Sequence, residues 1–362
     1  MWQNGHKKGK NYNLAILSND RTLPGRWAGG MNIQKRITQQ QQETVQMFEY
    51  FSGKVTRSAG VAAGAAFGVA LAVSSMMQPA RAGGPLPYDG PAPPPNVSVA
   101  FLYNQFASAS TFYTANGTKL GNTHIQTDVP VLRFVHTFSP IDGMPWGVQV
   151  IAPYVSFLGN QEVGGGSVSH QSGFAEPQLS AFLYPVNHPS QDETVVLAYF
   201  LSPPSGSYNP SIALNASTNN WVNNFEIGYM HKVFGQAKGK RLDLEVWADG
   251  YFYGNTNVQT GVHLKTDPAA QFIVYAPYYF HPQTDAYVGL SFEKTFGGKI
   301  SEVNPLGTFD TGSRNNFTRI GVIAGSFLSP TIFAQAQLAT DVQARGGAKN
   351  DIFFQVQVGK VF

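Results

Sequence analysis

Apolar and polar residues alternate along most of the chain after residue 95, most clearly at the C-terminus. In the last fourteen residues (KNDIFFQVQVGKVF), apolar side chains recur at every second position from Ile352 to Val358, with Gln355 and Gln357 between them. Successive side chains of a β-strand point to opposite faces, so this pattern predicts a strand with one apolar face.

The same alternation predicts twelve strands in total. They cover residues 96–107, 122–138, 146–158, 173–185, 194–203, 220–234, 241–254, 268–280, 284–296, 314–328, 331–343 and 349–362. A soluble β-sandwich and a membrane barrel are both compatible with such a set, so the links between the strands have to decide between them.

The predicted links alternate between short and long. Those after the even-numbered strands are short, for example HPQ and Ser329-Pro330, whereas most of those after the odd-numbered strands are long and rich in Gly, Asn and Ser. An even strand count with this alternation is typical of outer-membrane barrels, which have tight periplasmic turns and longer external loops. We therefore expect an all-β, transmembrane antiparallel barrel of about twelve strands, with both termini in the periplasm.

The composition agrees with this fold class. Of the 362 residues only 12% are charged and 13% are aromatic, and no apolar run is long enough for a membrane-spanning helix. A barrel needs only one apolar face per strand, which the outer-membrane lipid covers. Cysteine is absent, so neither a disulfide framework nor a thiolate metal site is expected.

The N-terminal part predicts export. Residues 1–53 have no usable periodicity and are expected to be a disordered or mis-started leader, with Met31 and Met47 as alternative starts to Met1. Residues 54–82 have the basic, apolar and Ala-x-Ala regions of a cleaved signal peptide. The proline-rich stretch 83–95 cannot join a sheet and is expected to be an extended periplasmic lead-in, which could thread the lumen, before a barrel of residues 96–362.

The distribution of charged residues along the chain does not indicate a nucleic-acid partner. Residues 1–82 contain 10 Lys and Arg against 3 Asp and Glu, and residues 83–362 contain 14 against 18, so the mature part has 14 − 18 = −4. No polybasic surface favours nucleic acid. The terminal Phe362 resembles the aromatic assembly signal of outer-membrane barrels, which implies the barrel-assembly machinery as a partner of the last strand.

The alternation also predicts which side chains face the lumen. Twelve strands enclose a space between the filled interior of eight-strand barrels and the open pore of porins. We expect a narrow, mixed interior suited to a small amphipathic solute, although the ordinary role of each inward charge would be to brace the wall as an ion pair. The candidate solute-binding residues are Arg133, Glu176, Glu226, Asp243, Glu245, Trp247, Asp249, Tyr251 and Arg319; Gln178, Asn224, Tyr287 and Glu293 are on the same faces.

Four segments carry a family resemblance: SGFAEPQLSAFLYP (172–185), LSPPSGSYNP (201–210), NWVNNFEIGYMHKVF (220–234) and LDLEVWADGYFYGNTN (242–257). In this order they resemble the family of meta-pathway phenol-degradation proteins, over most of residues 96–362. The resemblance implies an outer-membrane barrel that admits aromatic or other hydrophobic compounds by passive uptake. Where that family commonly has Gly-Asp-Pro, this chain has Ala175-Glu176-Pro177, which keeps the acid but loses the glycine.

Other function classes have weaker support. His170 and Ser172 faintly resemble the His-x-Ser element of an outer-membrane phospholipase, but a serine nucleophile also needs a base held by a third group. No pair of histidines has the spacing of metal ligands. We expect no enzyme activity, no cofactor and no metal. A structural or adhesive barrel remains an alternative, as does the fatty-acid transporter class, whose barrels have more strands and a plug.

Overall fold

The computed structural model describes residues 84–188, 193–235 and 239–362. The predicted leader and signal peptide lie outside these residues. Within the described ranges, no helix has both the length and the apolar character needed to cross a membrane.

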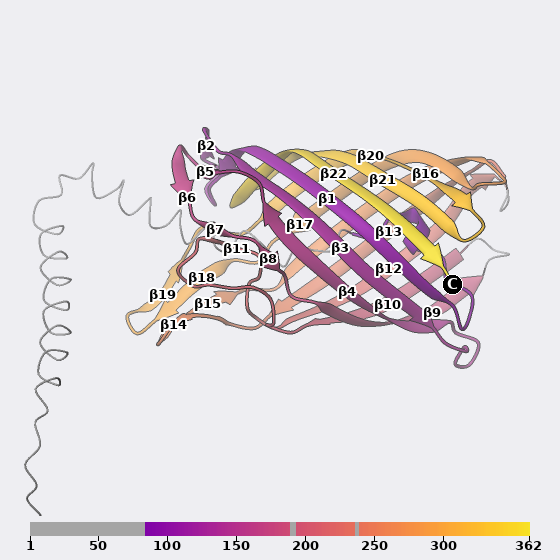
Figure 1. Ribbon diagram of the computed structural model, residues 1–362, viewed down its shortest axis with the longest axis horizontal. Helices are drawn as coiled ribbons and strands as arrows, with labels where there is room; N and C mark the ends of the chain where they lie inside the picture. Colours follow the sequence, from indigo (N-terminus) through magenta and orange to yellow (C-terminus); the bar gives the residue numbers. More distant parts are fainter. Residues whose placement is uncertain (1–83, 189–192, 236–238) are drawn as a thin grey trace, which may run out of the picture. The chain divides into compact units, whose positions relative to one another are not determined.

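Twelve long antiparallel strands form the body of the described chain (Figure 1). They are β1 (Ser98–Tyr113), β3 (Ile125–Thr137), β4 (Trp146–Phe157), β9 (Gln178–His188), β10 (Glu193–Ser202), β12 (Val222–Gly235), β13 (Arg241–Tyr253), β16 (Ala269–His281), β17 (Ala286–Phe296), β20 (Asn316–Ser329), β21 (Ile332–Arg345) and β22 (Gly347–Val361). Each overlaps one of the predicted ranges, and the all-β prediction is confirmed.

The sheet closes into a barrel because β1 pairs with β3 on one side and with the last strand, β22, on the other. Val99 lies opposite Val361 in this seam, and the Phe362 N–H donates to the Ser98 carbonyl oxygen at 2.8 Å. Closure matters because unpaired backbone groups at a sheet edge would be too costly in hydrocarbon.

The pleat directs apolar side chains outward and a mixed set inward. On β17, Val288, Leu290 and Phe292 are exposed, and Ser291 between them is buried. On β22 the buried positions include Gln355 and Gln357, as the alternation predicts. A soluble protein would bury the apolar face instead. This inverted pattern is that of a barrel whose outer surface contacts lipid.

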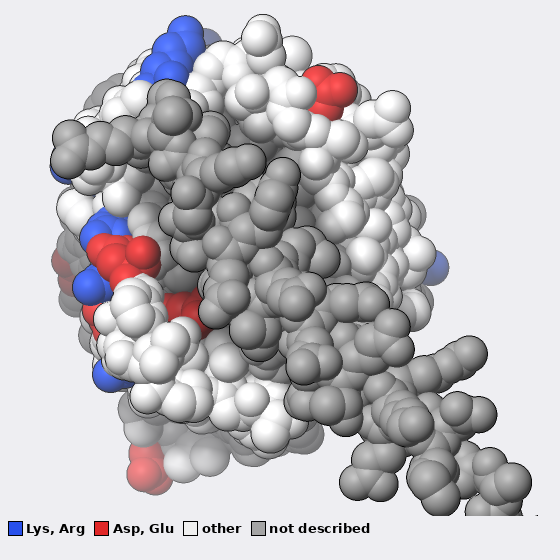
Figure 2. Space-filling model, turned by 90° about the vertical axis from the view of Figure 1, so that its left-hand side faces the viewer, with Lys and Arg blue, Asp and Glu red and all other residues white. Residues whose placement is uncertain are grey.

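The links sort by end as predicted. The short links 138–145, 282–285 and 330–331 lie at one end of the barrel, and the long links 158–177, 203–221, 254–268 and 297–315 lie at the other (Figure 1). We refer to the latter as the loop end. Figure 2 views the molecule from this side, where charged residues form a few small groups among uncharged ones.

The long links contain strands that the alternation did not reveal. Two of them form a separate four-stranded antiparallel sheet, the loop-end sheet, at the left of Figure 1. Its strands are β14 (Thr256–Gln259), β15 (Val262–Thr266), β18 (Ile300–Asn304) and β19 (Gly307–Asp310). The remaining short strands are β2 (Lys119–Leu120), β5 (Gln161–Val163), β6 (Gly166–Val168), β7 (His170–Gln171), β8 (Gly173–Phe174) and β11 (Leu214–Asn215).

The predicted strand 173–185 is wrong as a single element. β8 and β9 are separated by Ala175-Glu176-Pro177, and both pair with β4. Pro177 has no N–H to donate and Pro153 on β4 has none either, so the ladder is interrupted here. Ala175 is not among the described residues with positive φ, so the loss of glycine at this position has no backbone cost.

The proline-rich stretch before β1 lies inside the barrel. Residues 84–95, which we call the lumenal segment, contain one short 3-10 helix, η1 (Pro87–Asp89), and no strand. Leu86 is fully buried, and Tyr88 packs its ring against Tyr287, Phe327 and Phe333 of the wall. The segment is therefore more than a lead-in: it threads the lumen, the arrangement that the sequence left open.

Candidate functional site

Polar contacts fix the lumenal segment to one side of the barrel. The Tyr88 N–H donates to Gln335 Oε1 at 3.2 Å, and the Tyr88 hydroxyl donates to the Asp285 carbonyl oxygen at 2.6 Å. Asp89 Oδ1 accepts a hydrogen bond from Gln357 Nε2 at 2.9 Å. Because Gln335 and Gln357 belong to β21 and β22, the segment is held against these strands.

Arg133 on β3 joins the lumenal segment to the wall. Its Nη1 lies 3.4 Å from Asp89 Oδ1 and donates to the Tyr103 hydroxyl at 2.8 Å. The guanidinium also lies over the ring of Phe101, 4.8 Å from the centroid. The prediction that Arg133 faces the lumen is correct, and its charge is compensated by a carboxylate of the same chain.

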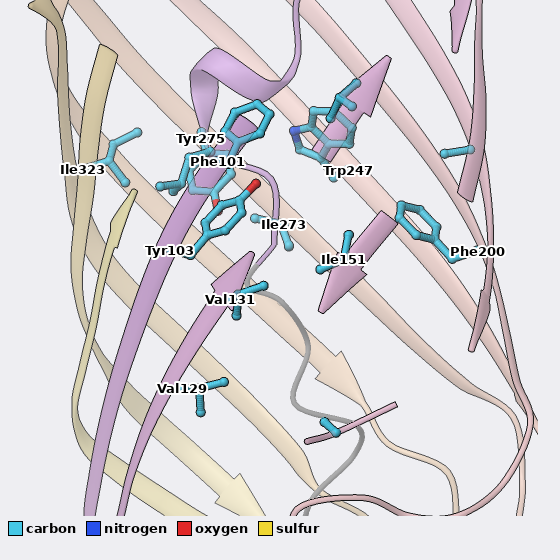
Figure 3. Close-up of a cluster of buried hydrophobic side chains, with 14 of the residues drawn as sticks. Phe101, Tyr103, Val129, Val131, Ile151, Phe200, Trp247, Ile273, Tyr275 and Ile323 are labelled. Atoms are coloured by element: carbon cyan, nitrogen blue, oxygen red, sulfur yellow. The ribbon is translucent and has the colours of Figure 1, made fainter. Parts of the chain in front are cut away.

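A cavity of ≈ 240 Å³ remains between the lumenal segment and the opposite wall. The wall residues come mainly from β4, β9, β10, β12 and β13. Apolar and aromatic side chains make up much of the lining, among them Ile151, Phe182, Tyr184, Phe200 and Trp247. Figure 3 shows Ile151, Phe200 and Trp247 inside the barrel, with Phe101 and Tyr103 nearby.

The polar part of the lining gathers on β12 and β13. Glu226 lies directly opposite Asp249 in the register of these strands, and Asn224 Nδ2 donates to Asp249 Oδ1 at 2.9 Å. The Tyr251 hydroxyl donates to Gln271 Oε1 at 3.3 Å. Of the nine candidate residues, the structure brings five to this cavity: Arg133, Glu226, Trp247, Asp249 and Tyr251.

Glu176 has a different environment. Its side chain is fully buried, and Oε1 accepts hydrogen bonds from Ser217 Oγ (2.5 Å), Thr218 N (2.8 Å) and Asn219 N (2.7 Å). The Thr218 hydroxyl donates to the same oxygen at 3.2 Å. Glu176 thus anchors the long link 203–221 to the break in the β4–β9 ladder, and it is not among the cavity-lining residues.

Arg319 and Asp243 belong to ion-pair networks in the wall. Arg319 Nε donates to Asp341 Oδ1 at 2.8 Å, and its Nη1 donates to Glu293 Oε2 at 3.3 Å. Asp243 Oδ2 accepts from Arg241 Nε at 2.9 Å. Glu245 lies on the inner face of β13 but outside the cavity lining. Arg319 and Asp243 therefore have the ion-pair role that the sequence left open as an alternative to solute binding. None of the three residues lines the cavity.

His170 and Ser172 do not form a nucleophile pair. Ser172 Oγ accepts a hydrogen bond from the Phe157 N–H at 3.0 Å, and His170 Nδ1 lies 3.4 Å from the Val168 carbonyl oxygen. No hydrogen bond joins the two side chains in the described structure. Nor do the described residues contain a group of three or more His, Asp or Glu that could hold a metal ion.

Several cavity residues were not singled out from the sequence. Tyr103, Gln149, Phe182, Tyr184 and the lumenal segment all contribute to the lining. For Gln149 the alternation on β4 was too irregular to assign a face. For Tyr103 both faces of β1 are rich in apolar residues, so only the structure of the closed barrel shows which face of β1 points inward.

Comparisons with known proteins agree with this architecture. The family described as "Putative MetA-pathway of phenol degradation" matches residues 109–355. The COG4313 outer membrane channel from Pseudomonas putida F1 is similar in fold, with a TM-score of 0.66, 22% identity, 77% of this chain covered and 100% of that chain. No curated protein matches the sequence.

Two further solved structures are more distant. The transport unit of the autotransporter AIDA-I from Escherichia coli has a TM-score of 0.47 and 10% identity, with 82% of this chain and 98% of that chain covered. A TodX monoaromatic hydrocarbon channel mutant has a TM-score of 0.40 and 8% identity, with 76% of this chain and 92% of that chain covered. Neither structure indicates a function for this chain.

Proposed function

The chain belongs to the MetA-pathway phenol-degradation family, and from that premise we propose that it is an outer-membrane channel for the passive uptake of small hydrophobic or aromatic compounds. The observation that carries the proposal is the aromatic-lined cavity inside a closed barrel with an apolar outer surface. The channel role of the structurally similar Pseudomonas protein is in line with it.

The size and lining of the cavity suit a small aromatic solute. An apolar cavity of about 150 Å³ is enough to bind benzene, and this cavity measures ≈ 240 Å³. Trp247 and Phe200 offer ring faces and edges to an aromatic guest. A few polar groups amid apolar lining are the usual composition of a small-molecule site.

Passage through the barrel involves the lumenal segment. A solute enters at the loop end, occupies the cavity and leaves on the opposite side when residues 84–95 shift against the wall. The Tyr88 N–H and hydroxyl each donate one neutral hydrogen bond to the wall, and each contributes about 1 kcal/mol net. Asp89 accepts from Gln357 and pairs with Arg133, and bonds to such a charged group contribute about 1.5–3 kcal/mol. The concentration gradient supplies the direction, and no cofactor is involved.

The test is flux into liposomes that contain the purified mature protein. Phenol-like solutes should pass faster than simple ions and sugars. Ala198→Trp places an indole in the cavity and should lower phenol flux by roughly tenfold, which corresponds to about 1.4 kcal/mol. Glu226→Ala and Asp249→Ala should also reduce uptake in barrels that still assemble.

The matched control is Ala181→Trp. Ala181 lies opposite Tyr199, the neighbour of Ala198, but is exposed on the outer face of β9. This change adds the same side chain on the lipid side and should leave flux unchanged. Equal flux through Ala198→Trp and wild type, or equal flux of phenol and sugars, would contradict the proposal.

A further inference from the structure

Negative charge prevails among the ionisable groups of the cavity. The charged residues in its lining are Asp89, Arg133, Glu226 and Asp249, which is one cation against three carboxylates. The cation is already engaged, because Arg133 contacts Asp89 and the Tyr103 hydroxyl. The other two carboxylates therefore set the electrostatic character of the side opposite the lumenal segment.

These two carboxylates lie side by side. Glu226 and Asp249 are direct partners across β12 and β13, and the Cβ atoms of such partners are about 4.5–5.5 Å apart. Like charges in directly opposite positions repel, and the repulsion is stronger in a barrel interior than in water. A cation bound between them would remove that repulsion.

Neutral polar groups in the cavity lining point to the same kind of ligand. Asn224 uses its Nδ2 to donate to Asp249, so its Oδ1 is left as an acceptor; this oxygen has no hydrogen-bond partner among the described residues, and the side chain is only 9% exposed. Gln149 Oε1 is likewise buried without a partner in the described structure. These two oxygens add to the acceptors of the acidic pair, and an ammonium group supplies three donors to such a set.

Aromatic rings lie next to the acidic pair. Trp247 and Tyr251 flank Asp249 on the same face of β13, and both line the cavity. The face of an aromatic ring attracts a cation, most strongly where water is excluded. The rings can also pack against the apolar body of a ligand, so one site accommodates both parts of a small amphiphile.

We infer that the cavity selects small hydrophobic amines, with the ammonium group between Glu226 and Asp249 and the apolar body against Trp247 and Phe200. The inference rests on the proposed channel function and narrows its substrate class. Uncharged alcohols and phenols of the same shape bind more weakly, because they offer one donor in place of three and no charge to balance the acidic pair. Anionic compounds bind weakest, because the charge of Arg133 is already compensated by Asp89 and the acidic pair repels anions.

The experiment is calorimetric titration of the purified mature protein in detergent with three ligands of similar size. These are 2-phenylethylamine, which is protonated at pH 7, uncharged 2-phenylethanol and anionic phenylacetate. The amine should bind at least about tenfold more tightly than the alcohol, because hydrogen bonds to charged groups are stronger than neutral ones. Phenylacetate should bind more weakly than both.

Glu226→Gln and Asp249→Asn should each weaken binding of the amine by roughly 10- to 100-fold and weaken binding of the alcohol much less. Glu302→Gln is the control, because it removes one negative charge from the loop-end sheet, outside the cavity. The comparison of the three ligands on the wild-type protein needs no variant, so it remains decisive if a substitution prevents assembly.

The outcomes separate this inference from the proposed function. Equal binding of amine and alcohol, or tighter binding of phenylacetate, overturns the selection for amines even where phenol flux persists. Loss of amine binding in Glu302→Gln to the same degree as in Glu226→Gln also overturns it. If no phenol flux is seen and none of the three ligands binds, the channel proposal itself fails.

Discussion

Carboxylates that the alternation assigns alike to the lumen have different environments in the folded barrel. Glu226 and Asp249 line the cavity, whereas Glu176 accepts four hydrogen bonds from the link 203–221. A carboxylate with several donors on one oxygen is a strong anchor, because bonds to charged groups contribute more than neutral ones. Glu176 is therefore a positioning residue for the loop end.

The consequence can be tested with Glu176→Gln and Glu176→Ala. The first keeps the shape but loses the charge, and the second removes the acceptor of all four hydrogen bonds from residues 217–219. Local stability of the link should fall by about 1–3 kcal/mol, more for alanine than for glutamine. Faster chymotrypsin cleavage at Tyr208 would report this loss.

Glu162→Gln, in the adjacent link 158–177, serves as the control and should leave cleavage at Tyr208 unchanged. Wild-type cleavage rates in both Glu176 variants would show that the four hydrogen bonds do not hold the link.

At the scale of elements, an ion-pair cluster lies at the edge of the loop-end sheet. Asp310, the last residue of β19, accepts hydrogen bonds from both terminal nitrogens of Arg314 and from the Gly312 N–H. Lys299 Nζ lies 3.7 Å from its carboxylate. The Arg314 guanidinium, helped by these neighbours, lowers the pKa of Asp310 from 3.8 to about 2.

A lowered folded-state pKa means that the ionised carboxylate stabilises the sheet above the unfolded value of 3.8, and that this contribution is lost as the pH falls towards about 2. Pepsin should therefore cleave near Leu306 and Phe309, both exposed, increasingly fast between pH 4 and pH 2. The increase should exceed the change in pepsin activity measured on an unfolded peptide.

In Asp310→Asn this part of the pH dependence should disappear, because no carboxylate is left to titrate. A pH profile identical to that of wild type would show that Asp310 does not stabilise the sheet.

On the scale of the whole molecule, the surrounding lipid determines at which exposed positions a charged side chain lowers stability. Leu290 near the middle of β17 is 66% exposed, and Leu306 in the turn between β18 and β19 is 88% exposed. In water the two would tolerate a charge equally well. If hydrocarbon covers β17, an arginine at position 290 must be desolvated, at about 2–4 kcal/mol near the bilayer midplane.

Leu290→Arg should accordingly lower the free energy of unfolding in phospholipid vesicles by about 2–4 kcal/mol, and Leu306→Arg by less than about 0.5 kcal/mol. Urea titration followed by tryptophan fluorescence measures both. Equal effects of the two substitutions would mean that the outer face of the barrel is not covered by hydrocarbon.

The barrel could be predicted from the sequence because its signals are local. The period of two along β13 and β22 follows from the pleat of each strand, and the length of each link is read directly from the chain. The same argument assigned Trp247 and Asp249 to the lumen correctly. It failed at residues 173–185, where Pro153 on β4 and Pro177 between β8 and β9 interrupt one ladder.

Which inward residues meet, by contrast, was decided only by the closed structure. Asp89 and Arg133 are far apart in sequence, and only the path of the lumenal segment through the barrel brings them within 3.4 Å. Alternation states that Glu176, Glu226 and Arg319 face inward but carries no information on their partners. Side-chain direction is a property of one strand, whereas a cavity depends on the packing of many elements at once.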